Sequence, residues 1–305
     1  MKELFIEKYR PVNIKDYVFR DDKQKRIIES WITDGIFPHL LLSGSPGVGK
    51  TSLAKVLLNE CQIEQNDVMI INSSSNNGID VLRDTIYAFV TTIPFGKFRV
   101  IILDEFDHAS LSFQTALRNM METYADDVRF ILTCNYPHKI IPAIHSRCQS
   151  FHIEKLNKSD FDMRVANILF AENIEFNIEI MDNFINATYP DLRKCLNLIQ
   201  QNIIDNKLTL SIESVNNTLD YMVQAVQFFK QKDFRKGREI ICKNAKVDDI
   251  ENIFTWCYNN LDLFASSDDK KDDAILIIRD GLVKHISCAN AELNLSATLI
   301  QLSRI

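Results

Sequence analysis

The sequence lacks any run of eighteen uninterrupted apolar residues, which excludes an obvious membrane-spanning helix. Residues 1–5 also lack the apolar core and the cleavage site of a secretory signal peptide. We therefore expect a soluble protein of the cytoplasm with no membrane partner. No internal repeat of fixed period and no low-complexity tail is present, which disfavours a repeat architecture.

Cysteine is present but without a pattern. The seven cysteines are scattered, odd in number and free of any Cys-x-x-Cys pair, so neither a zinc site nor a disulfide framework is supported. We expect reduced and mostly buried thiols. The cysteines are Cys61, Cys134, Cys148, Cys195, Cys242, Cys257 and Cys288.

The chain also lacks an excess of positive charge. Its net charge is −6, which argues against a basic coat for nucleic acid. Residues 1–156 carry 18 Lys and Arg against 19 Asp and Glu, net −1, whereas residues 157–305 carry 17 against 22, net −5. Any DNA-binding surface should therefore be local and lie in the first half.

Length and periodicity predict two or three domains in 305 residues, of which 46% are hydrophobic. In the first half, short apolar runs alternate with amphipathic stretches, which is typical of a doubly wound parallel α/β sheet of five strands. We predict strands near 39–43, 68–72, 99–103, 130–133 and 150–153, and helices near 23–33, 52–60, 80–91 and 112–124.

After residue 153 the strand signals stop and helical periodicity takes over. We predict an α/β domain over 1–156, a three-helix domain over 157–212 with helices near 160–173, 178–188 and 191–206, and an all-helical domain over 213–305. Within the last domain, the charged run 266–273 is expected to be a solvated loop.

A glycine-rich run, Gly44-Ser45-Pro46-Gly47-Val48-Gly49-Lys50-Thr51, directly follows the apolar residues 40–42. It fits the phosphate-binding pattern in its strand-loop-helix setting. Glycines let backbone N–H groups turn around phosphates, Lys50 can reach the β and γ phosphates, and Thr51 can bind Mg²⁺. The helix expected from Ser52 points its positive end at the anion. The run predicts binding of ATP with Mg²⁺.

Two acids, Asp104 and Glu105, directly follow the apolar residues 100–103. Such an unbroken run suits a parallel strand buried on both faces. We expect Asp104 to hold Mg²⁺ through water, and Glu105 to orient or deprotonate the attacking water, which marks hydrolysis. The alternative is a surface acidic pair at a strand end.

Two later residues separate kinds of ATPase. Asn135 ends the fourth expected strand, where it can bond the γ phosphate or the lytic water, or serve only as a turn residue. Arg147 would face outward from its own nucleotide and could therefore serve only a neighbouring subunit. Arginine is suited to stabilising a γ phosphate in trans, although a lone arginine can also be a plain surface charge.

Together these motifs resemble the series found in AAA+ sliding-clamp loader ATPases, over about residues 5–200. The series consists of Glu7-Lys8-Tyr9-Arg10-Pro11, the phosphate-binding run, Asp104-Glu105, Gln114-Thr115-Ala116-Leu117-Arg118, Asn135, Ser146-Arg147-Cys148 and Pro190-Asp191-Leu192-Arg193. Within that family the chain most resembles the large ATPase subunit of T4-type phage clamp loaders, and replication factor C small subunits come next. The motifs closest to the phage subunits are Asp104-Glu105-Phe106-Asp107, residues 189–194 and Ala291-Glu292-Leu293-Asn294-Leu295.

The resemblance implies roles at matching positions. Residues 157–212 would form a small helical lid, and residues 213–305 would form the collar through which the subunits assemble. Arg10 and its neighbours would line the adenine pocket, Asn135 would be the first sensor of the γ phosphate, and Arg193 on the lid would be the second. Arg147 would enter the site of the adjacent subunit. Asn72 matches a switch residue that restrains the catalytic glutamate until DNA arrives, unless it only caps its strand.

The same resemblance implies contacts with the backbone of primer-template DNA. The matching loop and helix start contain Ser74, Asn76, Asn77 and Arg83, whose small polar groups and helix N–H groups suit phosphate. Arg118 would relay the DNA signal to the nucleotide, or be an exposed helix charge. Relatives often carry a second arginine after it, where this chain has Asn119, so the relay can differ here. Leu111 and Phe113 could reach the clamp, but we expect them to pack inside.

The resulting hypothesis is an ATPase subunit that opens a ring-shaped sliding clamp and closes it on primed DNA during replication. It would work in a pentamer with copies of itself and a companion subunit, in a phage-infected cell. ATP binding would organise the assembly and hydrolysis would release the clamp. The alternatives are an AAA+ ring motor such as a branch-migration helicase, and a nucleotide-binding scaffold, which Glu105 and Arg147 disfavour.

Overall fold

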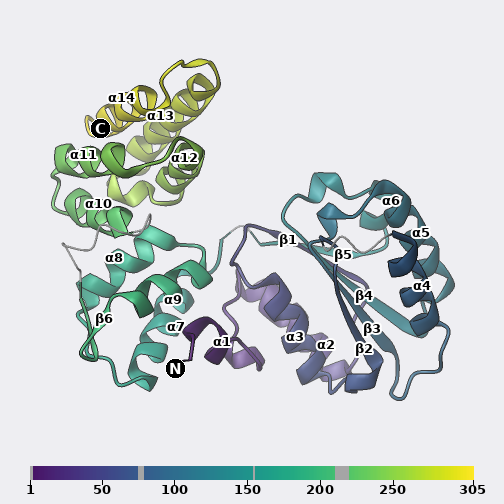
Figure 1. Cartoon of the computed structure of the whole chain (residues 1–305). Helices are drawn as coiled ribbons and strands as arrows, with labels where there is room; N and C mark the ends of the chain where they lie inside the picture. Colours follow the sequence, from purple (N-terminus) through teal and green to yellow (C-terminus); the bar gives the residue numbers. More distant parts are fainter. Residues whose placement is uncertain (1–2, 75–78, 154, 210–219) are drawn as a thin grey trace. The chain divides into compact units, whose positions relative to one another are not determined.

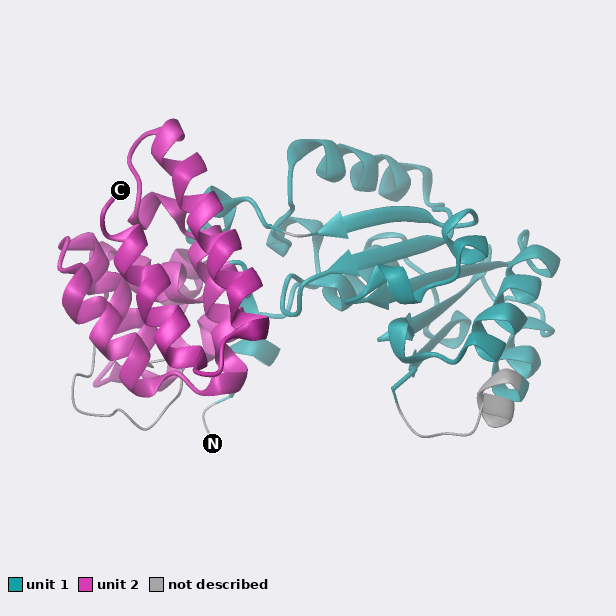
Figure 2. Cartoon of the chain, turned by 90° about the horizontal axis from the view of Figure 1, so that it is seen from above, with its two compact units in different colours: residues 1–164, 190–193 teal, residues 165–189, 194–305 magenta. Residues whose placement is uncertain are grey.

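The computed structural model describes residues 3–74, 79–153, 155–209 and 220–305 (Figure 1). The chain divides into two compact units (Figure 2). The first contains residues 1–164 and 190–193, and the second contains residues 165–189 and 194–305. Since the helical half forms one unit here, its division into a lid and a collar stays a prediction.

The first unit is built on a five-stranded sheet in the order β2-β3-β4-β1-β5. All four strand pairs are parallel, which confirms the predicted doubly wound sheet. The strands are β1 (Leu40–Gly44), β2 (Val68–Asn72), β3 (Arg99–Asp104), β4 (Val128–Cys134) and β5 (Gln149–Ile153). In β1, β3 and β4 nearly every residue is buried, as expected for strands covered on both faces.

Helices cover both faces of this sheet (Figure 1). One face packs on α4, α5 and α6 through a core that includes Leu41, Ile101 and Leu132 from alternating strand positions. The other face carries α2 and α3. The helices of this unit are α1 (Phe5–Lys8), α2 (Asp22–Asp34), α3 (Lys50–Glu60), α4 (Ile79–Val90), α5 (Leu111–Thr123) and α6 (Pro142–His145).

Local sequence signals explain where two of these helices begin. Asp21 accepts a hydrogen bond of 2.7 Å from the backbone of Gln24 at the start of α2, and Ser110 accepts one of 3.3 Å from Phe113 at the start of α5. At the opening of α5, Phe113 packs inside as expected, whereas Leu111 is 68% exposed. The expectation that both residues pack inside is therefore wrong for Leu111.

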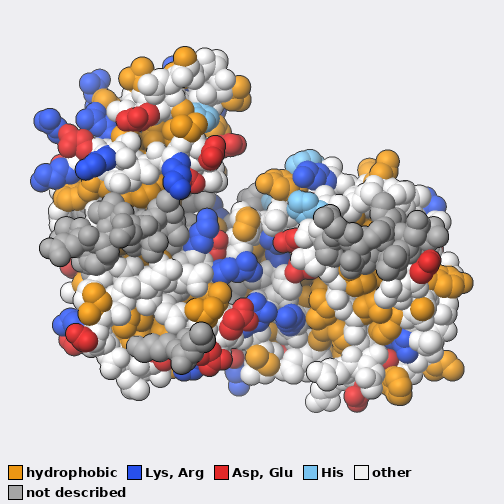
Figure 3. Space-filling view, viewed as in Figure 1, with side chains coloured by type: hydrophobic (Ala, Val, Ile, Leu, Met, Phe, Trp, Pro, Cys, Tyr) orange, Lys and Arg blue, Asp and Glu red, His pale blue; other side chains and the backbone are white. Residues whose placement is uncertain are grey.

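The second unit is almost entirely helical. Its helices are α7 (Lys158–Ala171), whose first turns belong to the first unit, α8 (Ile178–Thr188), α9 (Leu192–Gln201), α10 (Asp220–Lys230), α11 (Phe234–Asn244), α12 (Ile250–Asn259), α13 (Asp268–Ser287) and α14 (Ala291–Leu302). Polar contacts join α8 to the later helices: the indole of Trp256 donates to Asn186 O over 2.8 Å, and Lys230 donates to Asn183 over 2.8 Å and also pairs with Asp182. Positive side chains gather over α11 in the view of Figure 3.

Two expectations for the helical half are wrong. Strand structure does not stop after residue 153, because Ile203–Ile204 and Lys207–Leu208 pair as an antiparallel hairpin. Asp205 and Asn206 have positive φ there, as a tight hairpin turn requires. The charged run 266–273 is not a loop, because α13 begins at Asp268, where acidic side chains in the first turn are favourable.

Within the described parts of the chain, no helix is both long and apolar enough to cross a membrane. The seven cysteines, all of which are described, are free thiols. Cys134, Cys195 and Cys257 are buried and the other four are half-buried.

Candidate nucleotide site

The glycine-rich run forms the turn that joins the end of β1 to the start of α3. At Gly44, with φ of +146°, an added Cβ would lie 2.0 Å from the carbonyl oxygen of Ile153. At Gly47, with φ of +77°, it would lie 1.8 Å from the Asp191 carboxylate. Only glycine fits at these two positions. No side chain caps the first turn of α3, so its N–H groups are oriented for an anion such as phosphate.

Lys50 lies at the centre of the site and is 9% exposed. Its ammonium donates to Gly44 O and Ser45 O, both over 2.8 Å, and to Asn135 Oδ1 over 2.9 Å. Burial lowers the pKa of Lys50, and Asp104 and Asp107 oppose that shift. The structure therefore brings together two residues that lie far apart in the sequence, in the arrangement expected of a phosphate-binding lysine and a γ-phosphate sensor.

Asp104 is the last residue of β3, and its carboxylate contacts the phosphate loop at Thr51. The hydroxyl of Thr51 donates to Asp104 Oδ1 over 2.8 Å, and the hydroxyl of Thr133 donates to the same oxygen. Hard oxygen ligands of this kind are what Mg²⁺ prefers, and it is commonly bound through one or two protein oxygens together with phosphates. Thr51 and Asp104 therefore fit the predicted metal pair.

Glu105 has φ of +54°, which is unusual for a residue with a side chain. Its backbone N–H donates to Thr133 Oγ1 over 3.1 Å, so one hydroxyl fixes both predicted acids. Strained backbone of this kind clusters at functional sites. Sequence reasoning missed Thr133. The only sequence feature that could have identified it is its place just before Cys134 and Asn135.

Asp107 is a second residue that sequence reasoning missed. It is 5% exposed, and its Oδ2 accepts from the backbone N–H groups of Asn135 over 3.3 Å and Tyr136 over 3.2 Å. These bonds hold the turn that presents Asn135 to Lys50. The sequence feature that could have identified Asp107 is its place as the second aspartate of the run 104–107.

Arg10 and Arg193 are brought to the site less directly. Arg10 is paired with Glu7 over 3.0 Å at the surface, and no contact described here joins it to the phosphate loop. Arg193 is exposed, belongs to the same unit and lowers the pKa of Lys50 by its charge. Both roles stay predictions.

Arg147 bonds away from the phosphate loop. Its Nη1 donates to Ala143 O over 2.6 Å and to Ser146 Oγ over 3.3 Å, and its Nη2 pairs with Glu122 at the end of α5. The side chain is 30% exposed. No bond described here joins it to Lys50 or Asp104, as a residue that serves a neighbour would require.

Of the predicted switch and relay residues, Asn72 lies beside a predicted site residue. Asn72 is the partner of Asp104 in the β2-β3 register, and its Oδ1 accepts from the backbone N–H and the hydroxyl of Ser74 over 2.8 and 2.7 Å. Arg118, on α5, donates to Asn119 over 2.8 Å. Both roles stay predictions.

Of the predicted DNA contacts, Ser74 is described and exposed. Asn76, Asn77 and the side chain of Arg83 lie outside the described residues.

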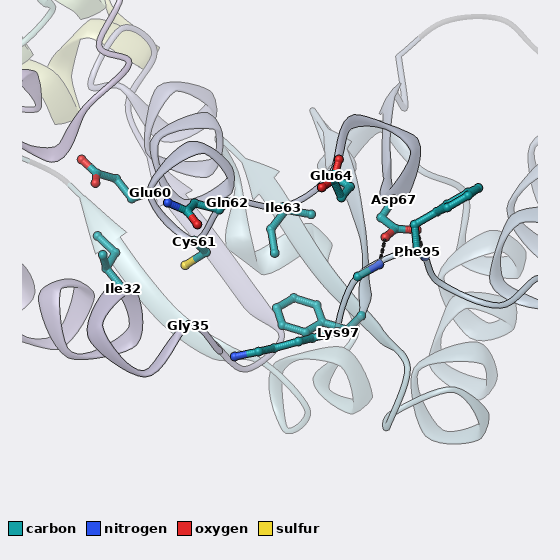
Figure 4. Close-up of a pocket in the computed structure, with 12 residues that line it drawn as sticks. Ile32, Gly35, Glu60, Cys61, Gln62, Ile63, Glu64, Asp67, Phe95 and Lys97 are labelled. Atoms are coloured by element: carbon teal, nitrogen blue, oxygen red, sulfur yellow. Dashed lines mark hydrogen bonds between the residues drawn. The ribbon is translucent and has the colours of Figure 1, made fainter.

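A separate cavity of about 490 Å³ lies between the segments that precede β2 and β3 (Figure 4). Since the sheet is parallel, this is the edge opposite the phosphate loop. Its walls include Ile63, Phe95 and Lys97, and Phe95 donates its backbone N–H to Asp67 there. None of the predicted site residues lines it.

Residues 40–156 match the family model described as "ATPase family associated with various cellular activities (AAA)". The replication factor C small subunit of Methanococcus vannielii is 35% identical over 258 residues, which cover 83% of this chain and 79% of that protein. The chain belongs to the replication factor C small-subunit family. The family protein of Sulfurisphaera tokodaii is also 35% identical, over 77% of this chain and 74% of its own length. That of Methanocella arvoryzae is 39% identical over 65% and 62%.

Family membership and the AAA domain make the chain a P-loop enzyme that hydrolyses ATP. Among solved structures, the RuvB Holliday junction branch migration motor of Thermotoga maritima matches 82% of the chain and 79% of its own length, with a TM-score of 0.57. The sequence identity is 14%, so this likeness shows the fold alone.

Proposed function

We propose that ATP binding to this chain opens a DNA sliding clamp and favours primer-template DNA, and that hydrolysis releases the clamp closed around the DNA. The chain is an ATPase subunit of a clamp loader in DNA replication, as its membership of the replication factor C small-subunit family indicates. The observation that carries the proposal is the bonded network at the carboxyl edge of the sheet. There Lys50 meets Asn135, and Thr51 meets Asp104.

In this proposal the chain's own residues divide the work. The phosphate loop and the start of α3 bind the phosphates, Lys50 and Asn135 orient the γ phosphate, and Thr51 and Asp104 hold Mg²⁺. Mg²⁺ held by these two residues would supply positive charge against the phosphates. Glu105 accepts the proton of the attacking water.

The active site is shared between subunits. Arg147 stabilises the transition state in the neighbour's site, because a guanidinium spreads positive charge over the γ phosphate. Its contact with Glu122 lies within its own chain and is half exposed, so docking of a neighbour can exchange it for phosphate. ATP hydrolysis would then occur only where two subunits are correctly assembled.

Assembly with further subunits is supported by α13. Leu276, Val283 and Ile286 are 52, 63 and 90% exposed and share one face of this helix, opposite the buried Ala274 and Ile278. Exposed apolar stripes mark interaction surfaces. We propose that this face joins copies of the chain and a companion subunit, in a pentamer.

DNA would be held through its backbone by residues 74–83, including Ser74, Asn76, Asn77 and Arg83. Several subunits would each contribute a few contacts, so a net charge of −6 does not exclude binding. Arg118 and Asn72 would couple this contact to Glu105.

Within this family, we propose that the chain is a subunit of a T4-type phage clamp loader and acts in the cytoplasm of the infected cell. Its support is the resemblance of the runs 104–107, 189–194 and 291–295. The relatives reported above are archaeal, so the family does not depend on this proposal.

The function is tested by the ATPase rate of the purified assembly with and without primed DNA and its clamp. We expect stimulation only when both are present. A rate that DNA and clamp leave unchanged would remove the clamp-loader proposal. A ring motor of similar fold would instead translocate continuously on DNA and form a closed six-fold ring, so the mass of the assembly separates the two.

A further inference from the structure

A positive segment surrounds α11 in a half of the chain that is otherwise acidic (Figure 3). Residues 232–246 carry six Lys and Arg against two Asp and Glu, net +4. The rest of residues 157–305 carries 11 against 20, net −9. Averaged over the whole half, this segment is hidden, which is why the charge of the two halves pointed to the first. A concentrated positive patch marks a surface for a polyanion.

Four exposed lysines of this segment lie on α11 or within two residues of its ends, and we call them the lysine row. They are Lys232, Lys236, Lys243 and Lys246. Lys236 and Lys243 are seven residues apart, so they lie on the same side of the helix, about 10 Å from each other along its axis. Gly237 and Ile241 are the buried residues of α11. The row therefore occupies the side of α11 that faces water.

Local ion pairs leave most of this charge available. Among the described residues, no acid pairs with Lys232, Lys243 or Lys246. Lys236 pairs with Asp233 over 2.9 Å, but its side chain is 63% exposed. Exposed pairs of this kind contribute little to stability, because water screens them. A phosphate can therefore replace Asp233 beside Lys236 at little cost to the fold.

The stability of α11 does not account for the row. A cation at the end of a helix is favourable, so Lys243 in the last turn suits the helix dipole. Lys236 lies in the first turn, where a positive charge is unfavourable. Solubility does not account for the row either, because the chain has a net charge of −6 and added lysines bring it nearer to zero. A negatively charged ligand accounts for both positions.

The row suits the phosphates of a nucleic acid rather than its bases. Lysine is a flexible point charge, and contacts of this kind hold a backbone without reading its sequence. The one aromatic residue of the segment, Phe234, packs on Phe229 and Phe264, with ring centres 5.8 and 6.4 Å apart, so it is not free to stack on a base. A DNA strand carries one phosphate per about 3.4 Å of its axis, so the row spans several phosphates.

We propose that the lysine row binds the phosphate backbone of DNA, as a second contact surface besides the one proposed for residues 74–83. The proposal rests on the clamp-loader function only for the choice of DNA as the polyanion. Binding at the row requires neither ATP nor the clamp, because none of the nucleotide-site residues belongs to it.

The test is the double variant Lys236→Gln with Lys243→Gln in the full chain, titrated without nucleotide over a range of salt concentrations. The probes are a fluorescent single-stranded oligonucleotide and a blunt duplex. We expect the Kd at low salt to rise about tenfold. The slope of log Kd against log salt should fall by about 1.4 for the single strand or about 1.8 for the duplex, because two phosphate contacts are lost. The form of DNA that shows its full change is the one that the row binds.

The matched control is Lys207→Gln with Lys284→Gln. Both residues are exposed lysines of the same unit outside the row, and the control has the same net charge as the test variant. It should bind DNA like the parent chain. Both variants should keep the parent melting temperature and Kd of ATP, because all four side chains are exposed. Lys243→Gln alone should give half the change in slope, and it replaces the double variant if that variant does not fold.

Three results would overturn the proposal. The first is an unchanged Kd and slope for both forms of DNA. The second is an equal loss in the control variant, which would show attraction by net charge alone. The third is weaker binding of polyglutamate with unchanged binding of DNA, which would assign the row to an acidic protein. Failure of the clamp-loader function looks different, because the lysine variant would still bind DNA more weakly while primed DNA and clamp left hydrolysis by the parent assembly unchanged.

Discussion

Arg147 bonds to Ala143, Ser146 and Glu122 of its own chain, outside the phosphate loop. Arg147→Ala should therefore spare nucleotide binding and lower hydrolysis by the assembly about 1,000-fold, the usual contribution of an arginine supplied in trans. The measurement is kcat together with the Kd of ATP. Arg235→Ala is the control, because Arg235 is an exposed arginine of the other unit.

A rate that Arg147→Ala leaves unaffected would remove the shared site. Glu122→Gln gives an independent check of the pair. If Glu122 acts through Arg147, the glutamine variant should change kcat in the parent chain and have no further effect beside Arg147→Ala.

Thr133 bridges the two acids through one hydroxyl, which donates to Asp104 and accepts from Glu105 N. Thr133→Val keeps the shape and removes both bonds. We expect kcat to fall about 10- to 100-fold with little change in the Kd of ATP, because the variant releases Glu105 from its position. Thr133→Ser keeps the hydroxyl and should stay near the parent rate. Equal rates for the two variants would contradict the role.

For single residues, the sequence predicted the side chains that the chemistry needs. It did not predict the side chains that hold them in position. Lys50, Thr51, Asp104 and Asn135 follow from short patterns at strand ends. Thr133, Asp107 and Glu122 do not, because their bonds join segments that only folding brings together.

Among the elements, the strands of the sheet were the most predictable. Short apolar runs mark the buried strands β1 and β3, and β1, β2, β3 and β5 all lie within a residue of the expected ranges. The hairpin of β6 (Ile203–Ile204) and β7 (Lys207–Leu208) was missed because two-residue strands show no period. The start of α13 was missed because its first turn is charged and exposed.

His39, just before β1, links this strand to β4 (Val128–Cys134), because its Nδ1 accepts from the backbone N–H of Phe130 over 3.1 Å. Burial, with a contribution from Arg129, lowers the pKa of His39 to about 4 from an ordinary 6.5. The unfolded chain therefore takes up the proton first. Stability should be unaffected above pH 6.5 and should fall as the pH drops from about 6.5 to about 4.

Over this pH range the free energy of unfolding should fall by on the order of 2 kcal/mol, after allowance for the partial exposure of His39. Urea unfolding at several pH values measures it. His39→Asn places an acceptor that does not titrate at the same position, so its free energy of unfolding should fall less over that range. An equal fall in both proteins would assign the pH dependence to other groups.

Over the whole molecule, the exposed face of α13 (Asp268–Ser287) is the feature that points to partners. Ile286 is 90% and Val283 is 63% exposed. Glutamate at both positions should reduce the mass of the assembly, because charge on an apolar interface has to be desolvated. The Kd of ATP for the free chain should not change. Light scattering gives the mass.

Val247→Glu is the control for this variant, since Val247 is 69% exposed and lies outside α13. A double variant that assembles like the parent chain would show that another surface joins the subunits. A free chain that binds ATP more weakly would show that the change has disturbed the fold.

The sequence by itself determined the parallel sheet, the phosphate-binding loop and the kind of enzyme, because each is marked by short motifs or by periodic patterns that can be read along the chain. Only the tertiary structure decided that Lys50 meets Asn135 and that Thr133 fixes Glu105. The physical reason is that side-chain bonds across distant segments depend on directions and distances that a one-dimensional pattern does not contain.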